Sequence, residues 1–110
     1  MGTQVVNFDT VRTVTSGGTA TTYAAVGGPF THMVRLICFT NNTNGDMFFS
    51  HDGVNDNLFV AAGSFKLFDL NTNRLNVDQM WVLPNNTQWY VRQSSTATSG
   101  SVYIECLWGQ

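Results

Sequence analysis

The stretch Ser50–Asn73, SHDGVNDNLFVAAGSFKLFDLNTN, decides the fold class. It contains a polar turn at Asp52–Asn57 and two apolar runs of strand length, Leu58–Ala62 and Phe65–Leu70, which are separated by Gly63-Ser64. Short apolar runs bounded by Gly, Asn, Asp and Ser are typical of β-strands. The stretch therefore predicts two strands joined by a tight turn, and a further hairpin turn at Asp52–Asn57.

The rest of the chain repeats this pattern of short strands and turns. Met33–Thr40 (MVRLICFT) is almost continuously apolar, which favours a central strand buried on both faces. Asn41–Asp46 contains Asn-Gly, the dipeptide that supplies positive φ angles in tight hairpins, so Met47–Ser50 is expected to pair back on that strand. Ser101–Trp108 alternates, with Val102, Ile104, Cys106 and Trp108 on one face.

These signals predict an all-β chain with about eight or nine short antiparallel strands, because no window has apolar residues at helical spacing. A single-domain β-sandwich over residues 1–110 follows, either jelly-roll-like or Ig-like. In Gln4–Thr15 the apolar phase slips between Phe8 and Val11. Residues 1–15 are therefore expected to be an edge strand with a bulge, or an extended arm that adds a strand to a neighbour's sheet.

The composition limits the possible partners. Only 11% of residues are charged, against about 25% in ordinary globular domains, and the net charge is −2. The basic residues are scattered singly, which argues against binding to nucleic acid or to an anionic membrane. No apolar run could span a bilayer and no signal peptide is recognisable, so we expect synthesis in a cytoplasm with Cys38 and Cys106 as buried free thiols.

Few residues suggest chemistry. Ser50-His51-Asp52 contains the residue types of a hydrolase triad, but neighbouring strand residues point to opposite faces, and nothing pairs His32 with Asp46. We therefore expect no enzyme, no catalytic residues and no cofactor. Asp52–Asn57 could collect oxygen ligands for Ca²⁺, but it does not match the EF-hand spacing, and turns in which Asp and Asn bond their own backbone are favoured. The glycosylation patterns at Asn41 and Asn85 are interpreted as chance matches in turns.

Aromatic residues exceed what one small core needs, so some are expected at the surface. Exposed aromatics on a β-sandwich indicate a protein interface or a platform that stacks sugars, and the low charge favours the protein interface. In the sugar-binding alternative Trp81, Trp89 or Tyr90 would stack on the sugar. The expected interface residues are Val5, Val6, Phe8, Val11, Phe59, Phe65, Trp81, Trp89, Tyr90 and Trp108.

The course TNNTNGDMFFSHDGVNDNLFVAAGSFKLFDLNTN, followed by LPNNTQWYVR and TSGSVYIECLWG, resembles small virion structural proteins of tailed bacteriophages. The resemblance covers about residues 40–108 and rests on turns and alternation. It implies a non-enzymatic β-sandwich that assembles in many copies on the particle after synthesis in the host cytoplasm. The expected role is a capsid decoration (cement) protein that binds other virion proteins and forms a homo-oligomer. A head–tail joining, neck or tail-fibre-base protein is the alternative within the particle, and a carbohydrate-binding module is the alternative outside it.

Overall fold

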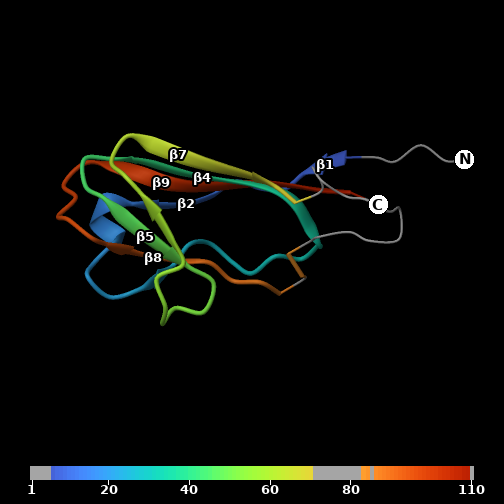
Figure 1. Cartoon of the computed structure of the whole chain (residues 1–110), viewed down its shortest axis with the longest axis horizontal. Helices are drawn as coiled ribbons and strands as arrows, with labels where there is room; N and C mark the ends of the chain where they lie inside the picture. Colours follow the sequence, from blue (N-terminus) through green and yellow to red (C-terminus); the bar gives the residue numbers. More distant parts are fainter. Residues whose placement is uncertain (1–5, 71–82, 85, 110) are drawn as a thin grey trace, which may run out of the picture.

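The computed structural model describes residues 6–70, 83–84 and 86–109, and this part of the chain forms two packed antiparallel β-sheets (Figure 1). Sheet A contains β1 (Val6–Phe8), β2 (Arg12–Thr15), β4 (Val34–Thr43), β7 (Ser64–Asp69) and β9 (Gly100–Gly109). Sheet B contains β3 (Ala24–Ala25), β5 (Met47–Ser50), β6 (Leu58–Val60) and β8 (Tyr90–Gln93). A 3-10 turn, Ser16–Gly18, follows β2. The predicted all-β, single-domain sandwich is confirmed.

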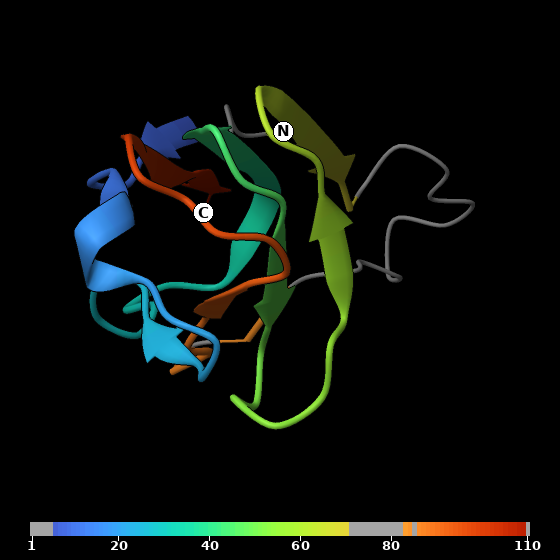
Figure 2. The ribbon, with the colours of Figure 1, turned by 90° about the vertical axis from the view of Figure 1, so that its left-hand side faces the viewer.

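The strand order is that of a jelly roll. Sheet A runs β1-β9-β4-β7, with β2 also on β9, and sheet B runs β3-β8-β5-β6. When β1 and β2 are counted as one interrupted strand, the described residues form eight strands, and most connections pass from one sheet to the other. Two four-stranded Greek keys folded over each other in this way form a jelly roll. Figure 2 shows the two layers and the connections that cross between them.

Two predicted hairpins are wrong, because the strands that they were expected to join lie in different sheets. β4 and β5 were expected to pair across Asn41–Asp46, but they belong to different sheets. Gly45 does not have a positive φ; it is required because a Cβ there would lie 2.6 Å from the carbonyl oxygen of Ser95. β6 and β7 likewise lie in different sheets, so Gly63-Ser64 is a crossover. The hairpin with its turn at Asp52–Asn57 is confirmed, because β5 pairs with β6.

The N-terminal segment is an edge strand with a bulge. β1 and β2 both pair antiparallel with β9, but Phe8 lies opposite Leu107 and Arg12 opposite Ile104. Four residue steps on one strand (8 to 12) therefore match three on the other (107 to 104), which leaves one extra residue. One of the two predictions for this segment is thus confirmed for the described residues: they extend the sheet of their own chain.

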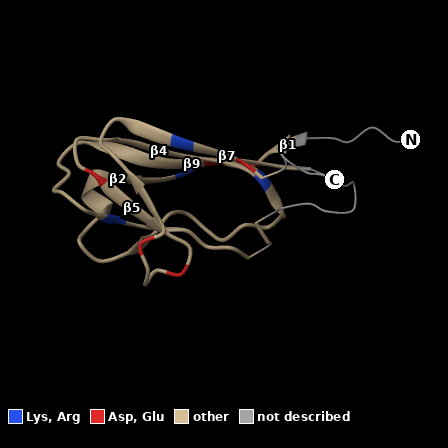
Figure 3. Cartoon of the chain, viewed as in Figure 1, with Lys and Arg blue, Asp and Glu red and all other residues tan. Residues whose placement is uncertain are grey.

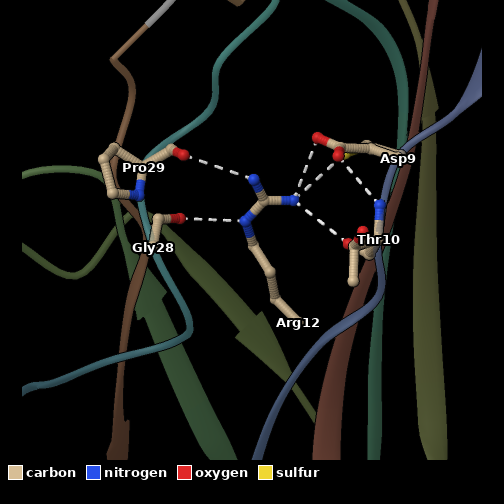
Figure 4. Close-up of polar contacts among 6 residues, drawn as sticks. Asp9, Thr10, Arg12, Gly28 and Pro29 are labelled. Atoms are coloured by element: carbon tan, nitrogen blue, oxygen red, sulfur yellow. Dashed lines mark hydrogen bonds and ion pairs between the residues drawn. The ribbon is translucent and has the colours of Figure 1, made fainter.

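Arg12 fastens this bulge to the loop that leads into Phe30 (Figure 4). Its guanidinium donates to the Asp9 carboxylate at 3.1 Å and to the carbonyl oxygens of Gly28 and Pro29, at 2.9 and 3.3 Å. It also lies 4.8 Å from the centre of the Phe30 ring. Burial alone would raise the pKa of Asp9, but the Thr10 N–H and the Arg12 guanidinium hold this pKa below its ordinary value. The ion pair is therefore a structural link between sheet A and the 27–30 loop.

The core lies between the inner faces of the two sheets. β4 and β9 contribute alternating buried residues, and sheet B contributes Met47, Phe49, Val60 and Val91 opposite them. The Phe39 ring lies 5.2 Å from the Phe49 ring and 4.7 Å from the Trp89 ring. β4 is fully buried on its inner face only, so the expectation of burial on both faces is wrong. Both cysteines are free as predicted, but only Cys106 is buried and Cys38 is half-buried on the other face.

One buried polar side chain holds the crossovers together. Asn41 is fully buried, and its amide nitrogen donates to the carbonyl oxygens of Gly45 and Val60, at 2.8 and 2.9 Å. Its side-chain oxygen accepts from the N–H and the hydroxyl of Thr43, at 3.1 and 2.6 Å. The side chain therefore joins β4 both to the corner that leads to β5 and to the end of β6. Because Asn41 is enclosed, it is not an available glycosylation acceptor in the folded chain.

Candidate interaction surface

The outer face of sheet A displays several large apolar side chains, and it combines residues from four distant parts of the sequence. The register places Leu67, Cys38 and Glu105 in one row across β7, β4 and β9. A second row contains Asp69, Leu36, Leu107 and Phe8, and a third contains Phe65, Thr40, Tyr103 and Thr13. On β4 and β9 these positions alternate with buried core residues, and the positions on β1, β2 and β7 are paired with them, so the side chains of all three rows point away from sheet B.

Several large apolar side chains on this face are strongly exposed. The exposed fraction is 81% for Phe8, 65% for Phe65 and 55% for Leu67, and Val11 at the β1–β2 bulge is 48% exposed. Single exposed apolar residues are normal on soluble proteins, whereas a group of them across one sheet marks an interaction surface. The face therefore has the apolar content of a protein-binding surface.

Charge on this face is sparse, and Arg35 lies at its end, between Val34 and Leu36 at the bulge in β4. Glu105 and Asp69 are the acidic residues in its rows, and few charged residues mark either layer (Figure 3). Lys66 lies on β7 but is paired with Phe39, which points inward, so it alternates to the opposite side of that strand. Glu105 is exposed and has no ion pair or hydrogen-bond partner in the described part of the chain.

The predicted interface residues lie in different parts of the structure. Phe8, Val11 and Phe65 lie at this face. Phe59 and Tyr90 lie on sheet B, where Phe59 is exposed and Tyr90 is half-buried above Gly53. Val5, the side chain of Val6 and Trp81 lie outside the described residues.

The other two predicted tryptophans differ in their surroundings. Trp89 is only 6% exposed, so its predicted place in an interface or as a sugar-stacking residue is wrong: it precedes β8 on the inner side and packs on Phe39. Trp108 is half-buried near the end of β9 and stacks on His32, with ring centres 3.6 Å apart. Neither ring is a freely exposed platform.

Sequence reasoning missed Leu67, Leu36, Leu107 and Glu105 as members of this surface. The alternation of Ser101–Trp108 did separate Glu105 and Leu107 from Val102, Ile104 and Cys106, and the structure shows that the second group faces the core. What it could not supply was the neighbour of each strand, because that depends on pairing between residues that are far apart in sequence. The apolar outer positions of β4 and β7 were the available signal.

Sheet B carries a second, internally satisfied cluster around Arg92. The guanidinium donates to both oxygens of Asp56, at 2.9 and 2.6 Å, and lies 4.6 Å from the centre of the Phe48 ring. The Tyr23 hydroxyl also donates to Asp56. The hydrogen bonds from Arg92, and then from Tyr23, lower the pKa of Asp56 to about 2, and the same pairing raises the pKa of Arg92. The cluster fixes the 51–57 loop onto sheet B, and Arg92 and Asp56 satisfy each other's charge within it.

The Ser50-His51-Asp52 trio forms a turn and not a relay. The Ser50 hydroxyl donates directly to the Asp52 carboxylate at 2.7 Å, while the exposed His51 ring approaches the Trp89 ring at 6.0 Å. Asp52 also accepts from the N–H groups of Val54 and Asn55, at 2.8 and 2.9 Å. These donors hold the pKa of Asp52 well below its ordinary value, and three of them share one carboxylate oxygen. The loop is therefore an Asx turn, as the sequence favoured.

The described residues also contain an apolar cavity, and they hold no cluster of metal-binding side chains. An apolar cavity of about 180 Å³ lies between the sheets and is lined by Ile37, Leu58, Phe68 and Trp89 among others. No three His, Cys, Asp or Glu side chains gather where they could share a metal ion, within the ranges 6–70, 83–84 and 86–109. In the same ranges, no helix is long and apolar enough to cross a membrane.

The chain matches no protein-family model, no curated protein sequence and no solved structure.

Proposed function

We propose that this protein is a non-enzymatic structural subunit that assembles with other proteins through the outer face of sheet A. The observation that carries the proposal is the group of exposed apolar side chains on that face, above all Phe8, Phe65 and Leu67. Sheets that expose such a group usually bury it against another protein. The low charged fraction, 11% of the chain, agrees with a surface that is covered in use.

The assembly that we propose is the virion of a tailed bacteriophage, with the protein as a capsid decoration (cement) subunit made in the host cytoplasm. The turn and strand pattern of residues 40–108 supports the virion, since it resembles small phage structural proteins. The jelly-roll topology is compatible with this role, because that architecture occurs in viral capsid domains and also in lectins and cupins. Fold analogy alone does not select among these uses.

A cement protein would stabilise a shell by binding the assembled form and not the free subunits. Many copies bound to one lattice would add their binding free energies, so a modest apolar contact per copy is sufficient. The proposal includes a homo-oligomer, in which copies of this chain also contact one another. No catalytic residue, cofactor or metal is needed for this action.

The experiment is to purify the virions of a phage that carries this gene and to measure the protein by quantitative mass spectrometry and by a particle map. Hundreds of copies on the shell are the expected result. Six, twelve or a few tens of copies at the neck or tail would move the protein to the head–tail joining or fibre-base alternative. Complete absence from purified particles would refute the virion role.

A further inference from the structure

The apolar cavity between the sheets runs from the core toward the surface of the molecule. Its volume is about 180 Å³, and side chains of both sheets line it. The deep part of the wall is formed by buried residues of sheet A and by the tryptophan before β8, and the outer part by half-buried residues. The buried residues are Ile37, Phe39 and Trp89, and the half-buried ones are Leu58, Phe68, Leu70 and Leu83.

The indole N–H of Trp89 is the one polar group among the described side chains that line this cavity. Trp89 is only 6% exposed, its indole nitrogen is fully enclosed, and this nitrogen has no hydrogen-bond partner in the described part of the chain. Buried N–H groups are nearly always paired, because an unpaired one has lost its bond to water without replacement. The N–H is therefore a donor that a molecule in the cavity can satisfy.

The lining limits the chemistry of such a molecule. A buried water needs about two to four polar partners, whereas the lining side chains supply one donor, so water is a poor occupant. A charged molecule is disfavoured, because no charged side chain lines the cavity among the described residues. An apolar cavity of about 150 Å³ binds benzene, so one of this size suits a single ring with a short substituent.

We propose that this cavity is a binding site for a small, uncharged and mainly apolar molecule, about as large as one substituted aromatic ring, with one oxygen that accepts a hydrogen bond from the Trp89 N–H. The inference goes beyond the proposed function, since the cavity lies between the sheets and not on the outer face of sheet A. The molecule would also stabilise the fold, because it binds the folded chain and not the unfolded one.

The test uses two probes of the same shape, acetophenone and α-methylstyrene, which differ in a carbonyl oxygen against a CH₂ group. Each is titrated into the ¹⁵N-labelled full chain. We expect both to cause saturable shifts of amides in β4, β6 and β7. Acetophenone alone should move the Trp89 indole N–H resonance downfield, as a new hydrogen bond does. Trp89→Phe identifies that resonance by its loss.

The same variant measures the hydrogen bond, because Trp89→Phe keeps an aromatic ring and removes the N–H. The two probes differ in hydration, so the quantity compared is the ratio of their dissociation constants in wild type and variant. We expect the variant to weaken acetophenone relative to α-methylstyrene by about fivefold. An unchanged ratio would overturn the assignment of the donor.

A second pair of variants tests the location. Leu58→Trp fills the cavity from β6 and should weaken both probes about tenfold or more. The matched control is Leu67→Trp, because Leu67 is exposed on the outer face of sheet A and does not line the cavity, and this variant should bind both probes as the wild type does. Amide spectra of each variant check that it folds. Where a variant does not fold, the indole shift in the wild type decides the question.

Two results would overturn the proposal. The first is the absence of saturable shifts with either probe in the wild-type chain. The second is undiminished binding in a folded Leu58→Trp variant, which would place the probes elsewhere.

Discussion

Replacing Asn41 by Ala should destabilise the fold far more than its polar character suggests. The side chain is fully buried and makes four hydrogen bonds, two as donor to Gly45 and Val60 and two as acceptor from Thr43. In Asn41→Ala the Thr43 hydroxyl can still donate to the Gly45 carbonyl at 2.8 Å. The Val60 carbonyl and the Thr43 N–H lose these side-chain partners.

The magnitude follows from those two groups. A buried polar group that loses its partner costs about 1–3 kcal/mol, so two cost about 2–6 kcal/mol, and the small cavity adds to this. We therefore expect the free energy of unfolding to fall by about 3–5 kcal/mol. That is a large part of the ~5–15 kcal/mol that stabilises a typical domain.

The assay is urea unfolding at equilibrium, with the slope m compared between variants to establish that the transition remains two-state. The matched control is Asn42→Ala, since Asn42 is the next residue of β4 and is exposed. This control is expected to change stability by less than about 0.5 kcal/mol. A loss below about 1 kcal/mol in Asn41→Ala, or equal losses in both variants, would refute the role given to the Asn41 network.

Three further predictions test other parts of the structure. Arg12→Met should lower the free energy of unfolding, measured by urea unfolding, by about 3–5 kcal/mol, because it leaves the Asp9 carboxylate unpaired at a largely buried position. Adding Asp9→Asn to this variant should restore part of the lost stability. Gly100→Ala should unfold at markedly lower urea concentration than wild type, since Gly100 has a φ of 87° and a Cβ would collide with the carbonyl oxygen of Asn42. The 51–57 loop should loosen in acid, because hydrogen bonds depress the folded pKa of Asp52 and lower that of Asp56 to about 2. The stability that these two carboxylates contribute is therefore complete above pH ~4 and is lost as the pH falls toward 2. Amide exchange of the loop measures this change, and Asp56→Asn should make the exchange less dependent on pH.

Much of the strand content was predictable because one face of each strand is buried. The alternation in Ser101–Trp108 placed Val102, Ile104, Cys106 and Trp108 on one face; the first three are buried and Trp108 is half-buried. The phase slip between Phe8 and Val11 likewise predicted the bulge that the register shows. These are local properties, because the side-chain period of a strand is fixed by the backbone.

Strand partners were less predictable, because a turn sequence reports the local path of the chain and not the sheet that it enters. Asn44-Gly45 has the composition of a hairpin turn, yet Gly45 serves close backbone contact with Ser95 and Thr96. The contact that sends the chain across the sandwich joins Asn41 to Val60, 19 residues later. Pairings of this kind involve residues that are distant in sequence and leave no local pattern.

The candidate surface was likewise predictable where it depends on local sequence and unpredictable where it depends on strand pairing. Large apolar residues on exposed strands, such as Phe8 and Phe65, could be proposed from the sequence. Trp89 could not be assigned to the correct side, because a single aromatic residue before a short strand fits either face until the register is known. The neighbours of Glu105 on this face, Cys38 and then Leu67, could be identified only from the register of β9, β4 and β7.

The same geometry argues for the way in which the protein binds. β7 is an edge strand of sheet A, and an exposed edge could accept a strand from another chain. Lys66 lies on the inner side of that edge and is exposed, and an inward-facing charge at an edge opposes strand addition, since the added strand would cover it. Phe65 and Leu67, its neighbours, present apolar side chains on the outer face. The edge therefore disfavours backbone pairing while the face favours side-chain packing, so a partner is expected to dock on the face of sheet A and not to extend it at β7.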